Sequence, residues 1–169
     1  MNKKTIKFFI VIFIHILILT GVALYYKWTK KGITVFLKIG RYDPMSPLRG
    51  DYLTLFYPEI SRIPFTEFAS SVSIGDTFYV PLEKKDKIWI RKKDVKIDKR
   101  KEYEGIFIKG MVKNVGSYVI LEYGIETYYI PVGTGEDIKW SDNDYAEIFI
   151  DENGNGKIKK IYLNGKQFP

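Results

Sequence analysis

The residue types that this chain lacks limit its chemistry more than those it contains. It has 169 residues with no cysteine and a single histidine, His15. The rest of the chain therefore cannot form Ser-His-Asp or Cys-His nucleophilic systems, or zinc sites with cysteine and histidine ligands. Catalysis would have to use paired carboxylates, a Ser-Lys pair, or a cation held by oxygen ligands. We predict no cofactor and no metal, and a chain that is more readily a binding protein than an enzyme.

Two groups of acidic residues have spacings that deserve comparison with known sites. Residues 151–156, Asp-Glu-Asn-Gly-Asn-Gly, imitate the start of a calcium loop, but the twelfth position is Tyr162 instead of the bidentate glutamate. A hairpin turn at one of the Asn-Gly pairs explains this segment better. A second group surrounds Trp140, as in some sugar-binding loops, and we interpret its members as turn residues: Asp137, Asp142 and Asp144.

A long apolar segment precedes all of these residues. Residues 8–26 are almost entirely apolar, and as a helix rising about 1.5 Å per residue they span roughly 28 Å, close to the hydrocarbon thickness of a bilayer. Aromatic residues expected at a membrane interface follow at Tyr25, Tyr26 and Trp28. We predict a tip, a single-pass anchor and a short tether in residues 1–31, and one soluble domain in residues 32–169.

The fate and orientation of this segment leave alternatives open. A small-x-small site at residues 21–23 would permit cleavage of a secretory signal, although an apolar signal region is usually only about 7 to 15 residues long. Three lysines precede the apolar run and three follow it, so the positive-inside rule is nearly balanced. The α-amino group and the usual behaviour of a first helix favour a domain outside the cytoplasm.

The domain after the anchor has the pattern of an all-β fold. Its apolar segments are short, rich in Ile, Val, Tyr and Phe, and separated by Gly, Asn, Asp or Pro. We predict an antiparallel barrel or sandwich of about eight or nine short strands, with one or two helical turns within residues 63–72. The expected strands are 33–39, 52–57, 77–82, 88–97 (with a break at 92–94 as the alternative), 104–112, 117–122, 127–132, 145–150 and 157–163.

Positive charge is concentrated in one stretch of the domain. Ten Lys or Arg and three Asp lie between Lys84 and Lys101, so this window carries the whole formal charge of +7. Such a stretch beside a membrane anchor can attract anionic lipid head groups, while nucleic acid fits poorly because no nucleic-acid motif is present. A solvated hairpin is the simpler interpretation. The candidate lipid-facing residues are Lys84, Lys85, Lys87, Arg91, Lys92 and Lys93.

The most distinctive segment is residues 41–57, a proline-rich loop that leads into a strand. Two prolines restrict its loop, and Gly50 permits a sharp turn before Asp51. Gly50-Asp51-Tyr52-x-x-Leu55-x-Tyr57 resembles the signature of the GDYXXLXY protein family at every defined position. The downstream segment 123–131 is also similar to this family, as is the order of one anchor followed by a β-rich domain. The resemblance implies a bacterial, membrane-anchored protein with no established activity and no catalytic residues to transfer.

Charged and aromatic residues of these two blocks are the candidate binding residues. If the blocks meet in the fold, Arg49 can pair with Asp51 or Glu126, or bind an acidic ligand. The tyrosines can line a groove for a sugar or peptide, but with 13 tyrosines in the chain we expect most of them to fill the core. The full candidate set is Asp43, Arg49, Asp51, Tyr52, Tyr57, Tyr123 and Glu126.

The loop at residues 44–51 is also similar to the loop of signal peptidases, which have an anchor and a β domain. Pro44 stands before Met45, where the family's serine nucleophile is expected, and Ser46 follows it instead. No later lysine stands in the context that the base requires, so the protease signature is incomplete.

These observations lead to one principal expectation and two alternatives. The resemblance implies that family members work beside multi-pass membrane proteins, so we expect an accessory or binding domain that acts with such a partner. Its expected location is a bacterial cell membrane, with the domain outside the cytoplasm. The alternatives are an envelope hydrolase that uses carboxylates or a Ser-Lys pair, and a protein that binds anionic lipid through residues 84–101.

Overall fold

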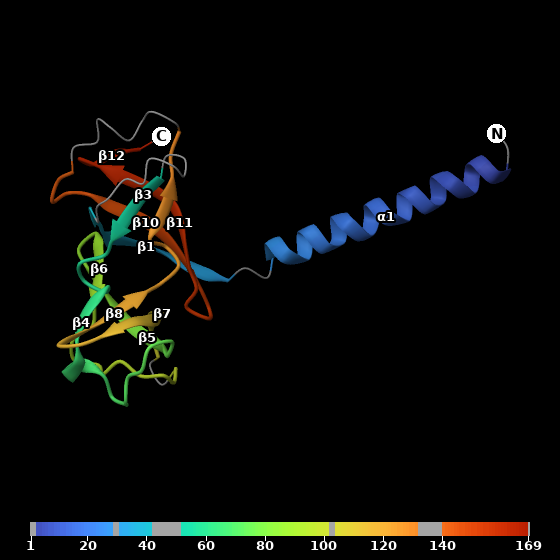
Figure 1. Ribbon diagram of the computed structural model, residues 1–169. Helices are drawn as coiled ribbons and strands as arrows, with labels where there is room; N and C mark the ends of the chain where they lie inside the picture. The colour runs from blue at the N-terminus through green and yellow to red at the C-terminus, as the bar shows by residue number, and fades with distance from the viewer. Residues whose placement is uncertain (1–2, 29–30, 42–51, 102–103, 132–139, 169) are drawn as a thin grey trace. The chain divides into compact units, whose positions relative to one another are not determined.

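The computed structural model describes residues 3–28, 31–41, 52–101, 104–131 and 140–168 (Figure 1). The chain forms two compact units, Met1–Lys31 and Gly32–Pro169. The first is a single helix, α1 (Lys3–Trp28), and its segment Lys7–Tyr25 is long and apolar enough to cross a membrane. The second unit is built almost entirely of strands. The predicted fold class, an all-β domain after one long apolar helix, is therefore confirmed.

Most strands of the domain belong to one nine-stranded sheet, in the order β12-β11-β10-β1-β6-β5-β7-β8-β4 (Figure 1). A smaller sheet has the order β2-β3-β9. The bounds are β1 (Gly32–Lys38), β2 (Gly40–Arg41), β3 (Tyr52–Phe56), β4 (Arg62–Pro64), β5 (Thr77–Lys85), β6 (Ile88–Arg91), β7 (Ile106–Val115), β8 (Tyr118–Glu122), β9 (Thr127–Tyr129), β10 (Tyr145–Asp151), β11 (Gly156–Leu163) and β12 (Lys166–Gln167).

Each predicted strand corresponds to a strand in the structure, and the additional strands are all very short. β2, β4 and β12 have two or three residues each, too few for an alternating pattern to show in the sequence. A single 3-10 turn, η1 (Phe65–Glu67), provides the helical turn expected in residues 63–72. The predicted strand 88–97 is interrupted within residues 92–94, where the prediction allowed a break: β6 ends at Arg91 and residues 93–94 form a turn, while the Lys92 N–H still donates to the Pro81 carbonyl of β5.

The larger sheet consists of two antiparallel groups of strands. β1 pairs with β10 and β5 pairs with β7 in antiparallel register, but β1 and β6 meet in parallel at Leu37 and Trp89. The predicted sheet was antiparallel throughout. A parallel pair cannot arise from a tight hairpin, so this contact depends on how the two groups come together in the fold.

Both sheets contribute to one hydrophobic core. Alternate residues of β1 and β10 point into it, as in half-buried strands, and so do Leu53 and Leu55 of β3. The largest side chains that are fully buried include Tyr57, Phe78, Leu37, Ile108 and Leu121. The core therefore fixes β3, which carries the distinctive motif, against the larger sheet.

Candidate functional site

The two motif blocks lie side by side, joined by strand pairing. β3 and β9 are antiparallel, with Tyr52 opposite Tyr129 and Leu53 opposite Tyr128. At the end of this ladder the Leu55 N–H donates to the Glu126 carbonyl at 2.7 Å. We call β3 together with β9 the motif ribbon. Residues that are separated by about 70 positions in the sequence thus form one local structure.

Two of the candidate tyrosines hold this arrangement together from inside the core. The Tyr57 hydroxyl donates to the Ile125 carbonyl at 2.6 Å, and the Tyr123 hydroxyl donates to the Ile60 carbonyl at 2.6 Å. The two bonds run in opposite directions between the turn after β3 and the turn before β9. The pKa of both phenols lies well above the ordinary value of a tyrosine. Burial is the main cause of this rise, and the nearby Glu126 carboxylate is the second. Both tyrosines are therefore core residues with satisfied hydroxyls, as expected for most of them.

Glu126 closes the turn that leads into β9. Its Oε1 accepts a hydrogen bond from the Tyr123 N–H at 2.6 Å, and Gly124 between them has a φ of 75°, which a glycine adopts without strain. Burial raises the pKa of the Glu126 carboxyl, and the bond from the Tyr123 N–H partly opposes this shift. The carboxylate thus stabilises the turn by accepting this hydrogen bond, although part of the side chain remains accessible to solvent.

The motif ribbon carries one strongly exposed aromatic residue. Tyr129 is 79% exposed, one of the most exposed large side chains of the described domain, and its strand neighbour Tyr52 is half-buried. Exposed aromatic side chains are enriched where proteins bind one another, since they supply contact area with a polar end. β9 is also the last strand in the order of its sheet. Tyr129, with Tyr52 beside it, is therefore the aromatic part of the motif ribbon that is most available to a partner.

The remaining candidates of the first block lie outside the described residues. These are Asp43, Arg49 and Asp51, together with Ser46 of the incomplete protease signature and Asp137 near Trp140. The possible pairing of Arg49 with Asp51 or Glu126 stays a prediction.

The predicted lipid-facing patch is divided among different environments. Lys84, Lys85 and Lys93 are exposed. Lys87 is exposed as well, but its ammonium group lies on an aromatic cluster: it donates to the Tyr145 hydroxyl at 2.6 Å and lies 4.3 Å from the centroid of that ring. Phe36 and Tyr162 complete this cluster, in which the rings of Tyr145 and Tyr162 are stacked.

Arg91 does not belong to an exposed basic patch, and the prediction that it faces lipid is wrong. Its side chain is only 7% exposed and forms a two-point ion pair with Glu67, with Nη1–Oε2 at 3.0 Å and Nη2–Oε1 at 3.4 Å. This ion pair connects β6 to η1. Lys92 is partly buried and pairs with Asp94 at 3.8 Å.

The acidic turns are structural, as interpreted from the sequence. Asp151 accepts bonds from the N–H groups of Asn153 and Asn155 in the β10–β11 hairpin, where Gly154 has a φ of 81°. Asp144 is buried, and its carboxylate accepts bonds from Ser141 and from the N–H of Asn164.

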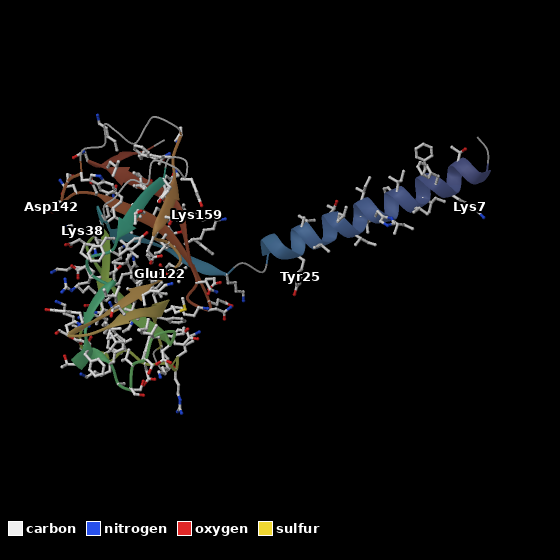
Figure 2. The ribbon with its side chains drawn as sticks, viewed as in Figure 1. Lys7, Tyr25, Lys38, Glu122, Asp142 and Lys159 are labelled. Carbon is white, nitrogen blue, oxygen red and sulfur yellow. The ribbon has the colours of Figure 1, made fainter. Side chains whose placement is uncertain are left out.

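Asp142 pairs with Lys38 at 3.6 Å, as Figure 2 shows from the positions of their side chains. Within the described part of the chain, no group of three or more His, Cys, Asp or Glu residues is placed to hold a metal ion.

The sequence did not single out the residues that line a surface pocket beside the segment 95–101. Lys96, Arg100 and Lys101 were counted within the basic window but not separated from it, and they lie together beside Tyr79 and Phe107. The density of charge at residues 99–101 was the only signal, and a charge run does not reveal which way each side chain points.

The fold defines a class: a β-rich domain that follows a single long apolar helix. The model of the GDYXXLXY protein family matches residues 14–161, which includes the second half of α1 and the domain as far as β11. The chain belongs to the GDYXXLXY protein family. No curated protein and no solved structure matches it.

Proposed function

We propose that this protein is a membrane-anchored binding domain that works with a multi-pass membrane protein at the outer face of a bacterial cell membrane. Its role is that of an accessory protein, not an enzyme. The motif ribbon provides the contact surface, centred on Tyr129 and Tyr52.

The exposed apolar surface of α1 is the observation that carries this proposal. Thirteen of its Phe, Ile, Leu and Val side chains are between 39% and 68% exposed. Soluble monomeric proteins rarely expose so large a continuous apolar surface to water. Transfer of such residues to the centre of a bilayer is favourable by about 0.3 to 0.6 kcal/mol each, so together they supply several kcal/mol.

The short connection between the two units supports a site of action close to the membrane. Only residues 29–31 separate the end of α1 from the start of β1, and three residues reach at most about 10 Å when extended. A domain attached in this way meets other membrane proteins far more often than soluble ones, because its effective concentration near them is high. A multi-pass protein is therefore the favoured partner.

Purification of the full chain from mild detergent after brief crosslinking tests the partner. We expect a multi-pass membrane protein to be recovered with the wild type, and at clearly lower yield with Tyr129→Ala. Tyr118→Ala is the matched control, because Tyr118 is also an exposed tyrosine on a strand, but on β8. Recovery of the chain alone, or equal yields from both variants, would contradict the proposal.

The anchor and its orientation require a separate test. Resistance of the chain to carbonate extraction, together with an intact mass that includes residues 1–23, would support a retained anchor. A topology reporter fused after Pro169 should be active outside the cytoplasm. A mature protein that begins after Ala23 and dissolves without detergent would replace the proposed accessory role with that of a secreted binder.

A further inference from the structure

A solvent-accessible pocket of about 260 Å³ lies in the domain beside the segment 95–101. It is distant in sequence from the motif ribbon and is formed by different elements, namely β5, β7, this segment and the chain after η1. The residues that give it chemical character are two aromatic side chains, three cations and one carboxylate: Tyr79, Phe107, Lys96, Arg100, Lys101 and Asp98.

The segment that carries the cations is held on both sides by backbone hydrogen bonds. The Ile97 N–H donates to the Glu67 carbonyl at 3.0 Å, and the Ala69 N–H donates to the Ile97 carbonyl at 2.9 Å. On the other side, the Tyr79 N–H of β5 donates to the Asp98 carbonyl at 2.9 Å. The segment is thus paired like a short strand between η1 and β5, and its charges are placed before any ligand arrives.

Two of the cations are further fixed by their own contacts. The Lys96 Nζ donates to the Thr66 carbonyl at 2.6 Å, and the Lys101 Nζ donates to the Glu152 carbonyl at 3.2 Å. Each ammonium group has three donors, so these bonds orient it and leave donors for a ligand. The Asp98 carboxylate, the acidic group among the described residues of the pocket lining, accepts a hydrogen bond from the Arg100 N–H at 3.1 Å, so part of it serves the backbone.

The aromatic residues form an apolar wall. The rings of Tyr79 and Phe107 make an edge-to-face pair with centroids 5.4 Å apart, and the Lys101 Nζ lies 4.8 Å from the Phe107 centroid. Phe107 is only 6% exposed, so the partly exposed Tyr79 ring supplies most of this surface, which favours the apolar face of a sugar or the carbon chain of a polyol.

We propose that this pocket binds the phosphate group of a small phosphorylated polyol, such as a sugar phosphate or the head group of a phosphoglycerolipid. Three cations against one carboxylate favour an anion, and the combination of Lys and Arg is typical of phosphate recognition. This inference does not rest on the proposed partner of the motif ribbon, because the pocket uses none of its residues.

Binding is tested with the full chain in dodecyl maltoside, a detergent without phosphate, by ³¹P NMR titration of glucose 6-phosphate and glycerol 3-phosphate. We expect a Kd of about 1 mM or tighter, with no binding of glucose or glycerol in ligand-observed ¹H NMR. The double variant Lys96→Gln with Lys101→Gln should raise the Kd by at least about tenfold, since it removes two charged donors.

Lys84→Gln with Lys85→Gln is the matched control, with the same loss of charge from the exposed end of β5. It should change the Kd by less than about twofold, because distant exposed charges are screened by salt. Ala69→Trp fills the pocket from an exposed position without a change of charge, and it should abolish binding while the melting temperature is kept. It serves as the test if the double variant does not fold.

The source of the phosphate is resolved by competition. If the ligand is a lipid head group, nanodiscs that contain phosphatidylglycerol should displace glucose 6-phosphate. If they do not displace it, the ligand is a soluble phosphate. Nanodiscs of phosphatidylcholine alone are the reference. No binding at 10 mM ligand, about ten times the expected Kd, would overturn the proposal. Equal losses from the pocket pair and the control pair would also overturn it, because they would show attraction by general positive charge.

Discussion

Replacement of Glu67 by glutamine tests whether Arg91 is a buried structural cation. The substitution keeps the shape of the side chain but removes its charge, which leaves the Arg91 guanidinium, only 7% exposed, without a counter-ion. Removal of one partner from a buried ion pair costs about 3 to 5 kcal/mol. Glu67 is 25% exposed, so water compensates in part, and we expect a loss of about 2 to 3 kcal/mol in the free energy of unfolding.

Glu122→Gln provides a matched control on the surface. Glu122 pairs with Lys113 at 2.6 Å, a shorter contact than that of Arg91 with Glu67, but both side chains are more than 40% exposed. An exposed pair contributes about 0 to 1 kcal/mol, so its loss should scarcely change stability. The comparison thus separates the effect of burial from that of distance.

The assay is thermal unfolding of the full chain in detergent, followed by near-UV circular dichroism. For a domain of this size, 2 to 3 kcal/mol corresponds to a decrease in Tm of roughly 6 to 10 °C, against about 3 °C or less for Glu122→Gln. Equal decreases in the two variants would refute the reasoning, because burial would then contribute nothing. A stable Glu67→Gln protein that binds anionic vesicles more strongly would restore Arg91 to a lipid-facing role.

Three further perturbations test the site and its turns. Tyr57→Phe and Tyr123→Phe should each cost about 1 to 2 kcal/mol in denaturant unfolding, because each leaves a buried carbonyl without its donor, whereas Tyr129→Phe should be neutral. Glu126 has a raised pKa in the folded state, so folding favours its protonated form, and its contribution to stability falls as pH rises through that pKa. Glu126→Gln should therefore gain stability relative to the wild type as pH rises above the ordinary pKa of a glutamate, and a difference in Tm that does not vary with pH would contradict this sign. The same variant should lose any hydrolytic turnover of envelope peptide or glycan if the hydrolase alternative is correct. Gly154→Ala should lower Tm, because the added carbon would lie 2.7 Å from the Phe107 ring and the residue would keep a φ of 81°; an unchanged Tm would mean that the hairpin adapts at no cost.

Much of the fold could be predicted because the relevant signals are local. An apolar run of this length and the alternation within β1, β3 and β10 report burial over a few neighbouring residues. The turns at residues 151–156 and around Asp144 were also correctly interpreted, because Asp and Asn stabilise turns through their own side chains. Strands of two or three residues were missed because so short a segment has no period.

The candidate site could be predicted only in part. The sequence left open whether the two motif blocks meet, and the strand pairing of β3 with β9 shows that they do. It could not divide the tyrosines into those that are buried, such as Tyr57 and Tyr123, and Tyr129, which is exposed, because all three occur in similar apolar surroundings along the chain. Only the packing of the turns against the core distinguishes them.

The sequence by itself determined the single apolar helix, the all-β domain, the family and the absence of cysteine and histidine chemistry from that domain, because composition and short-range periodicity are properties of the unfolded chain as well. Tertiary structure alone decided what each charge does. In a stretch of 18 residues it buries Arg91 against Glu67, places Lys87 on an aromatic cluster, and gathers Lys96, Arg100 and Lys101 around one pocket. The free energy of a charge depends on its distance from partners and from water, and both are set by segments that are remote in sequence.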